Sequence, residues 1–445
     1  MKKTEPRTLA GFMELLPEDQ IAMEQMKNKI ESIYQRFGFL PLDTPIIELS
    51  EVLLAKAGGE TEKQIYRFKK GETDLSLRFD LTVPLSKYVA KNYGNLSFPF
   101  RRYQIGKVYR GEKTQKGRYR EFYQCDIDII GDGELDIIHD AEMPSVIYNI
   151  FKELGFDNFT ICINNRKILN GLFEGLDQKE NSVEILRIID KIDKIGKEAV
   201  EKEFIKLGIS TQAIETIMNF ITIEGTSDEK IEKLENLKRE SIKSEIYAKG
   251  IEELKEVVKN IRLFGVPDSN FKIDLTIARG LDYYTGTVYE TFLNDYRELG
   301  SVCSGGRYEN LAEHYTDKKL PGVGVSIGLT RLFYKLNELN LIQSKQKSIS
   351  QVLIIPMIED LSKPIELATE LRKQKIKTEI YLSNKKLKAK FKYADKLKIP
   401  YVIILGEDEI ANNIMTIKNM ETGEEINETL GTVPKCLTKI DEKRR

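Results

Sequence analysis

The sequence predicts an α+β protein in which an antiparallel-sheet domain is interrupted by a helical insertion and followed by a small α/β domain. Three observations support this fold class. Two segments of strand composition flank a polar loop within residues 101–131, a pattern typical of an antiparallel hairpin. Apolar residues recur at helical spacing through much of 166–266. Strand and helix patterns alternate after residue 350, as they do in βαβ units.

The composition limits the classes of function. A chain of 445 residues is too long for one simple core. Its 69 Lys+Arg and 70 Asp+Glu give a net charge of -1, so a surface that binds nucleic acid would have to be local. Four scattered cysteines without a CxxC pair argue against zinc ribbons and disulfide frameworks. Because His139 and His314 are the only histidines, a histidine-based zinc site or a Ser-His-Asp triad is nearly excluded.

The sequence carries no signal for a membrane. No apolar segment follows the opening MKKTEPRTLAG, and no apolar stretch approaches the length of a transmembrane helix. The unpaired cysteines favour a reducing compartment. We therefore expect a cytoplasmic protein that does not associate with membranes.

The first 100 residues predict a helix followed by extended segments. Apolar positions at helical spacing predict a helix over 20–37, which Gly38 ends. The stretch FLPLDTPIIEL contains two prolines and predicts an edge or interface strand. Residues 65–92 then predict a strand, a turn, a second strand and a helix. Asp80 and Thr82 stand where the second strand meets this helix.

The hairpin predicted within 101–131 carries the strongest functional signal. Its loop is crowded with arginines and lysines, and guanidinium groups suit bidentate contacts with phosphate and carboxylate. On the returning strand, Phe122, Gln124, Asp126 and Asp128 alternate with apolar residues and form one polar, acidic face. A solvated hairpin tip is the plainer interpretation. The sharper hypothesis is a pocket for a nucleotide and a small molecule on a sheet.

The remaining segments complete the domain plan. The stretch 166–266 contains little that looks catalytic and favours a structural insertion. The glycines of GVGVSIG do not have dinucleotide-fingerprint spacing; they would let a strand and a helix approach a ligand closely. We predict the following domains: 1–165 and 267–342 as the two parts of the catalytic domain, 166–266 as the helical insertion, 343–350 as a linker and 351–445 as the α/β domain.

A Lys-rich helix is predicted in the last domain, in the stretch NKKLKAKFKYADKLKI. It has seven lysines and a single acid. A solvated helix face explains this composition, and so does a surface that follows a phosphate backbone. Both interpretations stay open at this point. The candidate residues for such a phosphate-binding surface are Lys385, Lys386, Lys388 and Lys392.

Five stretches in order resemble the histidyl-tRNA synthetases, a family of class II aminoacyl-tRNA synthetases. FGFLPLDTPIIE is similar to the first class II motif, which forms the dimer interface, and YRGE with GRYREFYQ is similar to the second. GVGVSIGLTRL is similar to the third. ARGLDYYTGTVYE and CSGGRYENL resemble the two histidine-specific motifs. The last domain resembles the anticodon-binding domain of class IIa synthetases.

The resemblance implies ligation of L-histidine to its tRNA through a histidyl-adenylate, with ATP and its Mg²⁺. Such chemistry needs positioning and charge stabilisation rather than an enzyme nucleophile. The implied catalytic residues are Arg110 and Arg279, both placed at the α-phosphate. The implied ATP-binding residues are Arg110, Glu112, Arg118, Phe122 and Arg331, with Arg331 at the γ-phosphate and Phe122 on adenine.

Selecting histidine requires groups that pair with its ring nitrogens, because an unpaired buried partner is costly. By resemblance, the histidine-binding residues are Asp80, Leu81, Thr82, Arg110, Gln124, Asp128, Arg279, Tyr283, Tyr284 and Tyr308. One branch of the family has Glu at the places of Asp80 and Asp128. Which of these two acids contacts the ring therefore stays open.

Two alternatives share parts of these patterns. A regulatory paralogue of ATP phosphoribosyltransferase has the catalytic fold but generally lacks the last domain and the full ARGLDYY motif. A non-catalytic module that senses histidine or tRNA would be expected to lose one of the motif arginines, and this sequence keeps all of them. We therefore expect an enzyme, active as a homodimer, whose partners are histidine tRNA, L-histidine and ATP.

Overall fold

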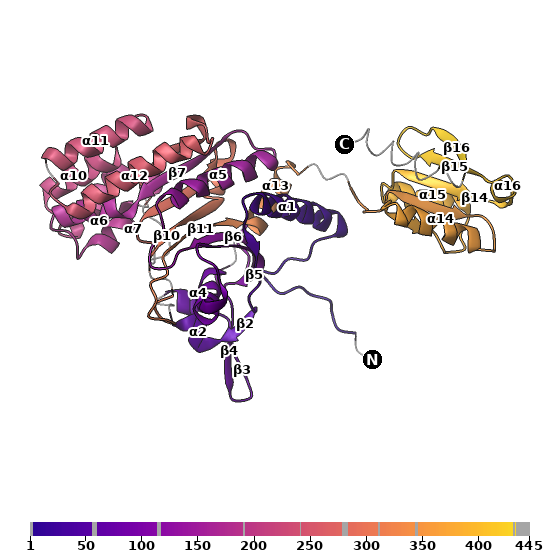
Figure 1. Ribbon diagram of the computed structural model, residues 1–445, viewed down its shortest axis with the longest axis horizontal. Coiled ribbons are helices and arrows are strands. Elements are labelled where there is room, and N and C mark those ends of the chain that lie inside the picture. Colours follow the sequence, from indigo (N-terminus) through magenta and orange to yellow (C-terminus); the bar gives the residue numbers. More distant parts are fainter. Residues whose placement is uncertain are drawn as a thin grey trace. The chain divides into compact units, whose positions relative to one another are not determined.

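A computed structural model of the chain (Figure 1) contains both sheets and helices, in agreement with the predicted α+β class. It divides into two compact units, residues 1–13 with 26–339 and residues 14–25 with 340–445. The residues that the structure describes are 3–55, 60–113, 117–189, 192–240, 242–277, 284–309, 312–342, 346–429 and 432.

An eight-stranded sheet forms the centre of the first unit, with the order β1-β5-β6-β11-β10-β9-β7-β8. The six strands from β5 to β7 pair antiparallel, and the outer pairs β1–β5 and β7–β8 are parallel. The predicted hairpin is the pair β5–β6. The strands are β1 (Leu40–Pro41), β5 (Phe100–Tyr109), β6 (Glu121–Ile130), β7 (Phe159–Asn165), β8 (Phe271–Ile273), β9 (Thr287–Leu293), β10 (Cys303–Tyr308) and β11 (Gly322–Gly328).

The alternation on β6 separates its two faces. Cys125, Ile127 and Ile129 are completely buried on the apolar face. Helix α1 (Pro17–Arg36) is tied to this strand by Tyr34, whose hydroxyl donates to the Cys125 carbonyl at 2.9 Å. Helix α5 (Ile138–Glu153) contributes further buried apolar residues. Burying this face fixes the register of the hairpin, because a shift by one residue would turn the acids inward to the apolar core.

A smaller sheet of three strands, in the order β2-β4-β3, lies in the same unit. The stretch FLPLDTPIIEL does not form one extended strand: β1 lies at the edge of the large sheet and β2 belongs to the small one. Pro41 and Pro45 supply no N–H for a continuous ladder, which accounts for the division. The elements are β2 (Ile47–Leu49), α2 (Ser50–Leu54), α3 (Glu60–Gln64), β3 (Arg67–Lys70), β4 (Thr73–Leu77), α4 (Thr82–Asn92) and η1 (Tyr93–Asn95).

The stretch 166–266 is helical, as its periodicity predicts. Its longest helix, α12, buries Ile251, Leu254 and Val258 at helical spacing and contacts α5, α6 and α11. The helices are α6 (Arg166–Gly175), α7 (Ser182–Ile189), α8 (Ile192–Ile195), α9 (Lys197–Lys206), α10 (Thr211–Ile221), α11 (Ser227–Glu240) and α12 (Glu245–Leu263). After it come η2 (Asp268–Asn270), η3 (Asn294–Leu299) and α13 (Leu329–Glu338), among the strands of the large sheet.

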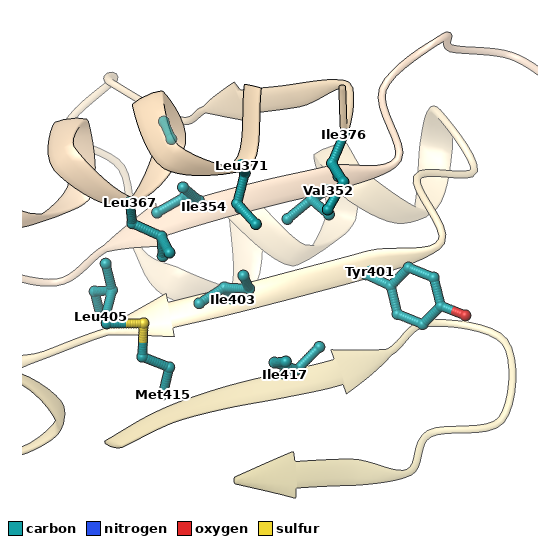
Figure 2. Close-up of a cluster of buried hydrophobic side chains, with 11 residues drawn as sticks. Val352, Ile354, Leu367, Leu371, Ile376, Tyr401, Ile403, Leu405, Met415 and Ile417 are labelled. Carbon is teal, nitrogen blue, oxygen red and sulfur yellow. The ribbon is translucent and has the colours of Figure 1, made fainter. Parts of the chain in front are cut away.

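The second unit has a five-stranded sheet in the order β13-β12-β14-β15-β16, with β12 parallel to both β13 and β14. Figure 2 shows one face, where Leu367 and Leu371 of α14 cover Ile354 and Ile403. Helix α15 buries Ala394 against the other face. The elements are β12 (Val352–Pro356), α14 (Ser362–Lys373), β13 (Thr378–Ile380), α15 (Leu387–Lys396), β14 (Tyr401–Leu405), α16 (Glu407–Ala411), β15 (Ile414–Asn419) and β16 (Glu425–Thr429).

Candidate active site

A cavity of about 480 Å³ opens on the polar face of the β5–β6 hairpin. Its walls come from the start of α4, the hairpin and its loop, strands β9, β10 and β11, and the beginning of α13. Nine of the predicted site residues line it: Asp80, Thr82, Arg110, Glu112, Arg118, Phe122, Gln124, Tyr284 and Arg331. Segments far apart in the sequence therefore meet at one site, as the motif resemblance implies.

Three other predicted residues, Asp128, Tyr308 and Leu81, do not line the cavity. Asp128 and Tyr308 contact each other, with the Tyr308 hydroxyl donating to Asp128 at 2.9 Å, but neither lines the cavity. Leu81 is fully buried beside the start of α4. Arg279 and Tyr283 fall outside the described residues. Their predicted roles stay predictions.

The basic part of the cavity is built around Arg110. Its Nε donates to the Phe79 carbonyl at 2.9 Å, and its guanidinium lies 5.2 Å from the centre of the Phe122 ring. A guanidinium held at one nitrogen keeps its remaining donors for a ligand. The arrangement therefore supplies a fixed cation beside an aromatic face, which suits a nucleotide phosphate and its base.

Two further arginines extend this basic part. Arg118 lies 3.7 Å from Glu112 across the loop. Arg331, at the start of α13, donates to the Leu299 carbonyl at 2.5 Å. Burial, and to a smaller extent the charge of Arg118, lowers the pKa of Arg331. Two cations that repel each other in a cavity favour the binding of an anion between them.

The carboxyl groups in the acidic part of the cavity are largely shielded from solvent. Burial raises the pKa of Asp80 to about 6, although its Oδ1 accepts from the Val83 amide at 3.0 Å. Burial also raises the pKa of Asp126, against the opposing effects of Arg102, Ser326 and Arg110. Asp126 was not among the predicted site residues, and it lines the cavity. Its place on the alternating polar face was the signal that could have identified it.

A buried ion pair lies behind this acidic part. Arg102 stands opposite Asp128 in the β5–β6 register, and their side chains pair at 2.5 Å with no exposure of the arginine. Burial raises the pKa of Asp128 to about 7, while Arg102 opposes this increase. Sequence reasoning missed Arg102, because an arginine on a strand does not by itself indicate burial.

The glycines of β11 make room for these side chains. A Cβ on Gly324 would lie 2.2 Å from Asp128 Oδ1, and a Cβ on Gly322 would lie 2.5 Å from the Tyr308 ring. Gly322 and Gly324 therefore make room for protein side chains. The prediction that the glycines of this stretch let a ligand approach closely stays a prediction.

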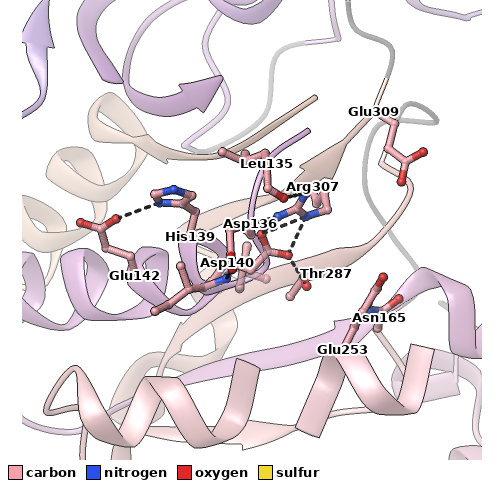
Figure 3. A network of polar contacts seen from close by, with 12 residues as sticks. Leu135, Asp136, His139, Asp140, Glu142, Asn165, Glu253, Thr287, Arg307 and Glu309 are labelled. Atoms are coloured by element: carbon pink, nitrogen blue, oxygen red, sulfur yellow. Dashed lines mark hydrogen bonds and ion pairs between the residues drawn. The ribbon is translucent and has the colours of Figure 1, made fainter. Parts of the chain in front are cut away.

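A second polar network fixes the strand that carries Tyr308 (Figure 3). Arg307 binds Asp140 through Nε at 2.9 Å and also donates to the carbonyls of Leu135 and Asp136, each at 3.0 Å. The Thr287 hydroxyl donates to the same Asp140 carboxylate at 2.6 Å. Arg307 thus ties β10 to the start of α5, which positions Tyr308 beside Asp128.

The Lys-rich helix is α15 with the residues before it. Lys385, Lys386, Lys388 and Lys392 are exposed. Lys390 differs: it is buried and donates to the Pro356 carbonyl at 2.7 Å. Its charge therefore serves the packing of the domain rather than a free surface.

In the part of the chain that the structure describes, there is no cluster of three or more His, Cys, Asp or Glu side chains that could hold a metal ion. Within the same residues, no helix is both long and apolar enough to cross a bilayer.

The comparisons with known proteins agree with the motifs. Residues 11–332 match the model of the histidyl-tRNA synthetase family, and residues 351–440 match that of the anticodon-binding domain. The chain is 60% identical to the histidine–tRNA ligase of Clostridium tetani, covering 95% of this chain and 96% of that protein. It is 52% identical to the ligase of Finegoldia magna, covering 94% and 96%.

Solved structures show the same fold. The histidyl-tRNA synthetase of Nostoc sp. PCC 7120 matches with a TM-score of 0.91 and 37% identity, over 98% of this chain and 100% of that one. A structure from Bacillus halodurans, described as an ATP phosphoribosyltransferase regulatory subunit/histidyl-tRNA synthetase, has a TM-score of 0.73 at 21% identity, over 88% and 97%. This second likeness concerns the fold alone.

The antiparallel sheet with its arginine-bearing hairpin, followed by an anticodon-binding domain, defines a class II aminoacyl-tRNA synthetase. Within that class, the chain belongs to the histidyl-tRNA synthetase family.

Proposed function

We propose that this chain ligates L-histidine to its tRNA in two steps at the cavity on the β5–β6 hairpin. In the first step, a carboxylate oxygen of histidine attacks the α-phosphorus of ATP. The bond between that phosphorus and the bridging oxygen breaks, and pyrophosphate leaves. In the second step, a hydroxyl of the terminal ribose of the tRNA attacks the acyl carbon, and AMP leaves.

The observation that carries this proposal is the division of a single cavity into a basic and an acidic part. Arg110 and Phe122 stand at one part, and Gln124, Asp80 and Asp126 stand at the other. An amino acid brings a carboxylate and an ammonium group, and ATP brings phosphates and an aromatic base. The cavity offers a complementary group for each of these.

Individual roles follow from the surroundings of each residue. Arg110, held at Nε by Phe79, would hold the α-phosphate and the histidine carboxylate together, while Phe122 stacks on adenine. Glu112, Arg118 and Arg331 would line the ATP site, with Arg331 at the γ-phosphate. Thr82, Gln124 and Tyr284 line the cavity and would recognise histidine. Asp128 and Tyr308, which do not line it, stay in this list by resemblance. Arg279 and Tyr283 stay in these lists by motif alone.

ATP would arrive with Mg²⁺, which uses one or two carboxylates and the substrate phosphates as ligands. Glu112 and Glu290 line the cavity and fit this requirement. When bound, the ion would neutralise phosphate charge that develops as pyrophosphate leaves.

The remaining assignments concern the whole protein. The second unit would bind the tRNA anticodon region, in line with its family match, and Lys385, Lys386, Lys388 and Lys392 would contact the phosphate backbone. The active form would be a homodimer built on the first class II motif. A tRNA substrate would place the activity in the cytoplasm.

The test is amino-acid-dependent exchange of labelled pyrophosphate into ATP, measured with purified full-length protein. We expect exchange with histidine that exceeds the exchange with any other standard amino acid. A protein without exchange, as expected of a regulatory paralogue or a sensing module, would contradict the proposal. So would exchange without amino acid preference.

A further inference from the structure

Arg102 is a fully buried cation that connects the polar face of the hairpin to the segment before α4. Its side chain has no exposure to solvent and stands opposite Asp128 in the β5–β6 register. Its Nη2 pairs with Asp128 Oδ2 at 2.5 Å and also donates to the Leu81 carbonyl at 3.5 Å. Leu81 lies between Asp80 and Thr82, two residues that line the cavity. Arg102 itself does not line the cavity, so it would act on a ligand through these neighbours.

Packing does not account for this arginine. Its Nε and Nη1 are buried without a hydrogen-bond partner among the described residues. Buried donors that stay unpaired carry the full penalty of leaving water. Replacing a buried ion pair with apolar side chains of similar volume is often neutral or stabilising. What Arg102 supplies at this position is therefore its charge and its contact with Asp128.

The groups that face Asp128 come from every element around it. Arg102 approaches from β5, Tyr308 from β10 and Asp80 from the segment before α4, while Asp126 lies on β6 itself and β11 contributes a glycine. Burial raises the pKa of Asp128 to about 7; Arg102 is the main opposing influence, and the two other acids raise this pKa further. Without Arg102, the acidic neighbours and the burial of Asp128 would both favour its protonated form.

We propose that Arg102 is a positioning residue for histidine, holding Asp128 in place as a carboxylate behind the cavity. The inference rests on the proposed function, in which Asp128 recognises histidine by resemblance. A carboxylate only accepts hydrogen bonds, whereas a protonated acid also donates one. Protonation of Asp128 would therefore set a donor against an N–H group of the substrate. Loss of the Arg102 charge would weaken histidine binding and leave the ATP site around Arg110 and Phe122 unchanged.

The experiment measures histidine-dependent pyrophosphate exchange with purified full-length Arg102→Met between pH 6.5 and pH 9. Removing an adjacent opposite charge raises the pKa of a carboxyl group by roughly one to two units. The KM of histidine should therefore exceed that of wild type by about fivefold to fiftyfold at pH 7, and by no more than about twofold at pH 9, where the carboxylate forms again. The KM of ATP should stay within about twofold of wild type at every pH, because its site is separate. Free histidine titrates identically in both assays, so the ratio of KM values reports on the protein.

Arg101→Met is the matched control. Arg101 precedes Arg102 on β5 and pairs with Glu142 of α5 at 2.6 Å, away from the cavity. Its histidine KM should equal that of wild type at every pH. Arg102→Lys keeps the charge, so its ratio of KM values to wild type should not depend on pH. Arg102→Gln serves as a second neutral variant if Arg102→Met does not fold.

Asp128→Asn shows whether Arg102 acts through Asp128. Because no carboxylate remains at this position, adding Arg102→Met to Asp128→Asn should leave the pH profile of the histidine KM unchanged. A shift of the profile that persists in the double variant would assign the effect to Asp126 and overturn the proposal.

An unchanged histidine KM at pH 7 in the neutral Arg102 variants would also overturn it. Equal increases for histidine and ATP, or an increase that does not depend on pH, would indicate a structural role and have the same consequence. So would an Arg102→Lys profile shifted as far as that of Arg102→Met, since the charge would then not be responsible. Absence of histidine-dependent exchange in wild type would instead contradict the proposed function.

Discussion

The buried carboxyl groups around the cavity lower the stability of the ligand-free protein at neutral pH while remaining available to bind a ligand. Asp80 is almost fully buried, and burial raises its pKa from 3.8 to about 6. Because the folded pKa lies above the unfolded one, the stabilisation from this proton is complete below about pH 4 and is lost as the pH rises through about 6. Asp128, with a pKa raised to about 7, acts in the same direction.

A stability measurement can isolate Asp80. Asp80→Asn removes the pH-dependent contribution of this residue to the free energy of unfolding. Relative to wild type, the unfolding free energy of the variant should therefore increase by about 1–1.5 kcal/mol between pH 5 and pH 8. The measurement is urea unfolding of both proteins without ligand at the two pH values. An equal difference in unfolding free energy at pH 5 and pH 8 would argue against a raised pKa. Asp132→Asn, at an exposed position, is the control: its difference from wild type in unfolding free energy should be the same at pH 5 and pH 8.

At the scale of elements, patterns local in sequence were predictable and partners distant in sequence were not. The β5–β6 hairpin follows from two alternating segments around a polar loop, and its acidic face from alternation alone. Arg102 and Asp126 were missed as functional positions, since the depth of a polar residue on the hairpin depends on strand β11, which pairs with β6 although Ser326 and Asp126 are 200 residues apart in the sequence. Only the structure shows that Asp126 lines the cavity and Asp128 lies behind it.

Helix α15 illustrates the same limit. Its composition left a solvated face and a phosphate-binding face open, and Lys390 belongs to neither, because it is buried against Pro356. The packing of the helix, which composition does not reveal, determines that Lys390 is buried. The exposed lysines remain the candidates for a tRNA surface.

Charge reversal separates the two interpretations of α15. The triple variant Lys386→Glu/Lys388→Glu/Lys392→Glu should raise the KM for tRNA in aminoacylation by roughly tenfold at low salt, and less as salt rises, because fewer counterions are released from the RNA. Pyrophosphate exchange should not change. The control is Lys363→Glu/Lys373→Glu on α14, where both lysines pair with acids of the same helix. Similar tRNA KM values for the two variants would favour a solvated face.

For the whole molecule, the family and its two-domain plan were predictable, since five motifs in order constrain the fold more than any single pattern does. The assembly state is a different matter. It depends on a second copy of the chain, and the first class II motif suggests an interface only by resemblance. Side chains of this stretch that would be expected inside are exposed in the single chain, including Leu40, Ile46, Ile47 and Leu49.

These exposed apolar residues lie on β1, β2 and the segment between them. A two-fold symmetric dimer would use the same patch on both copies, so one substitution would act twice. We expect wild type to sediment at twice the chain mass of 51.2 kDa and Ile47→Glu to shift toward the monomer, because two buried carboxylates would face the interface. Ile205→Glu, at an exposed apolar position on α9, is the control and should stay dimeric. Sedimentation of wild type as a monomer at micromolar concentration, or an Ile47→Glu protein that remains dimeric, would remove this surface as the interface.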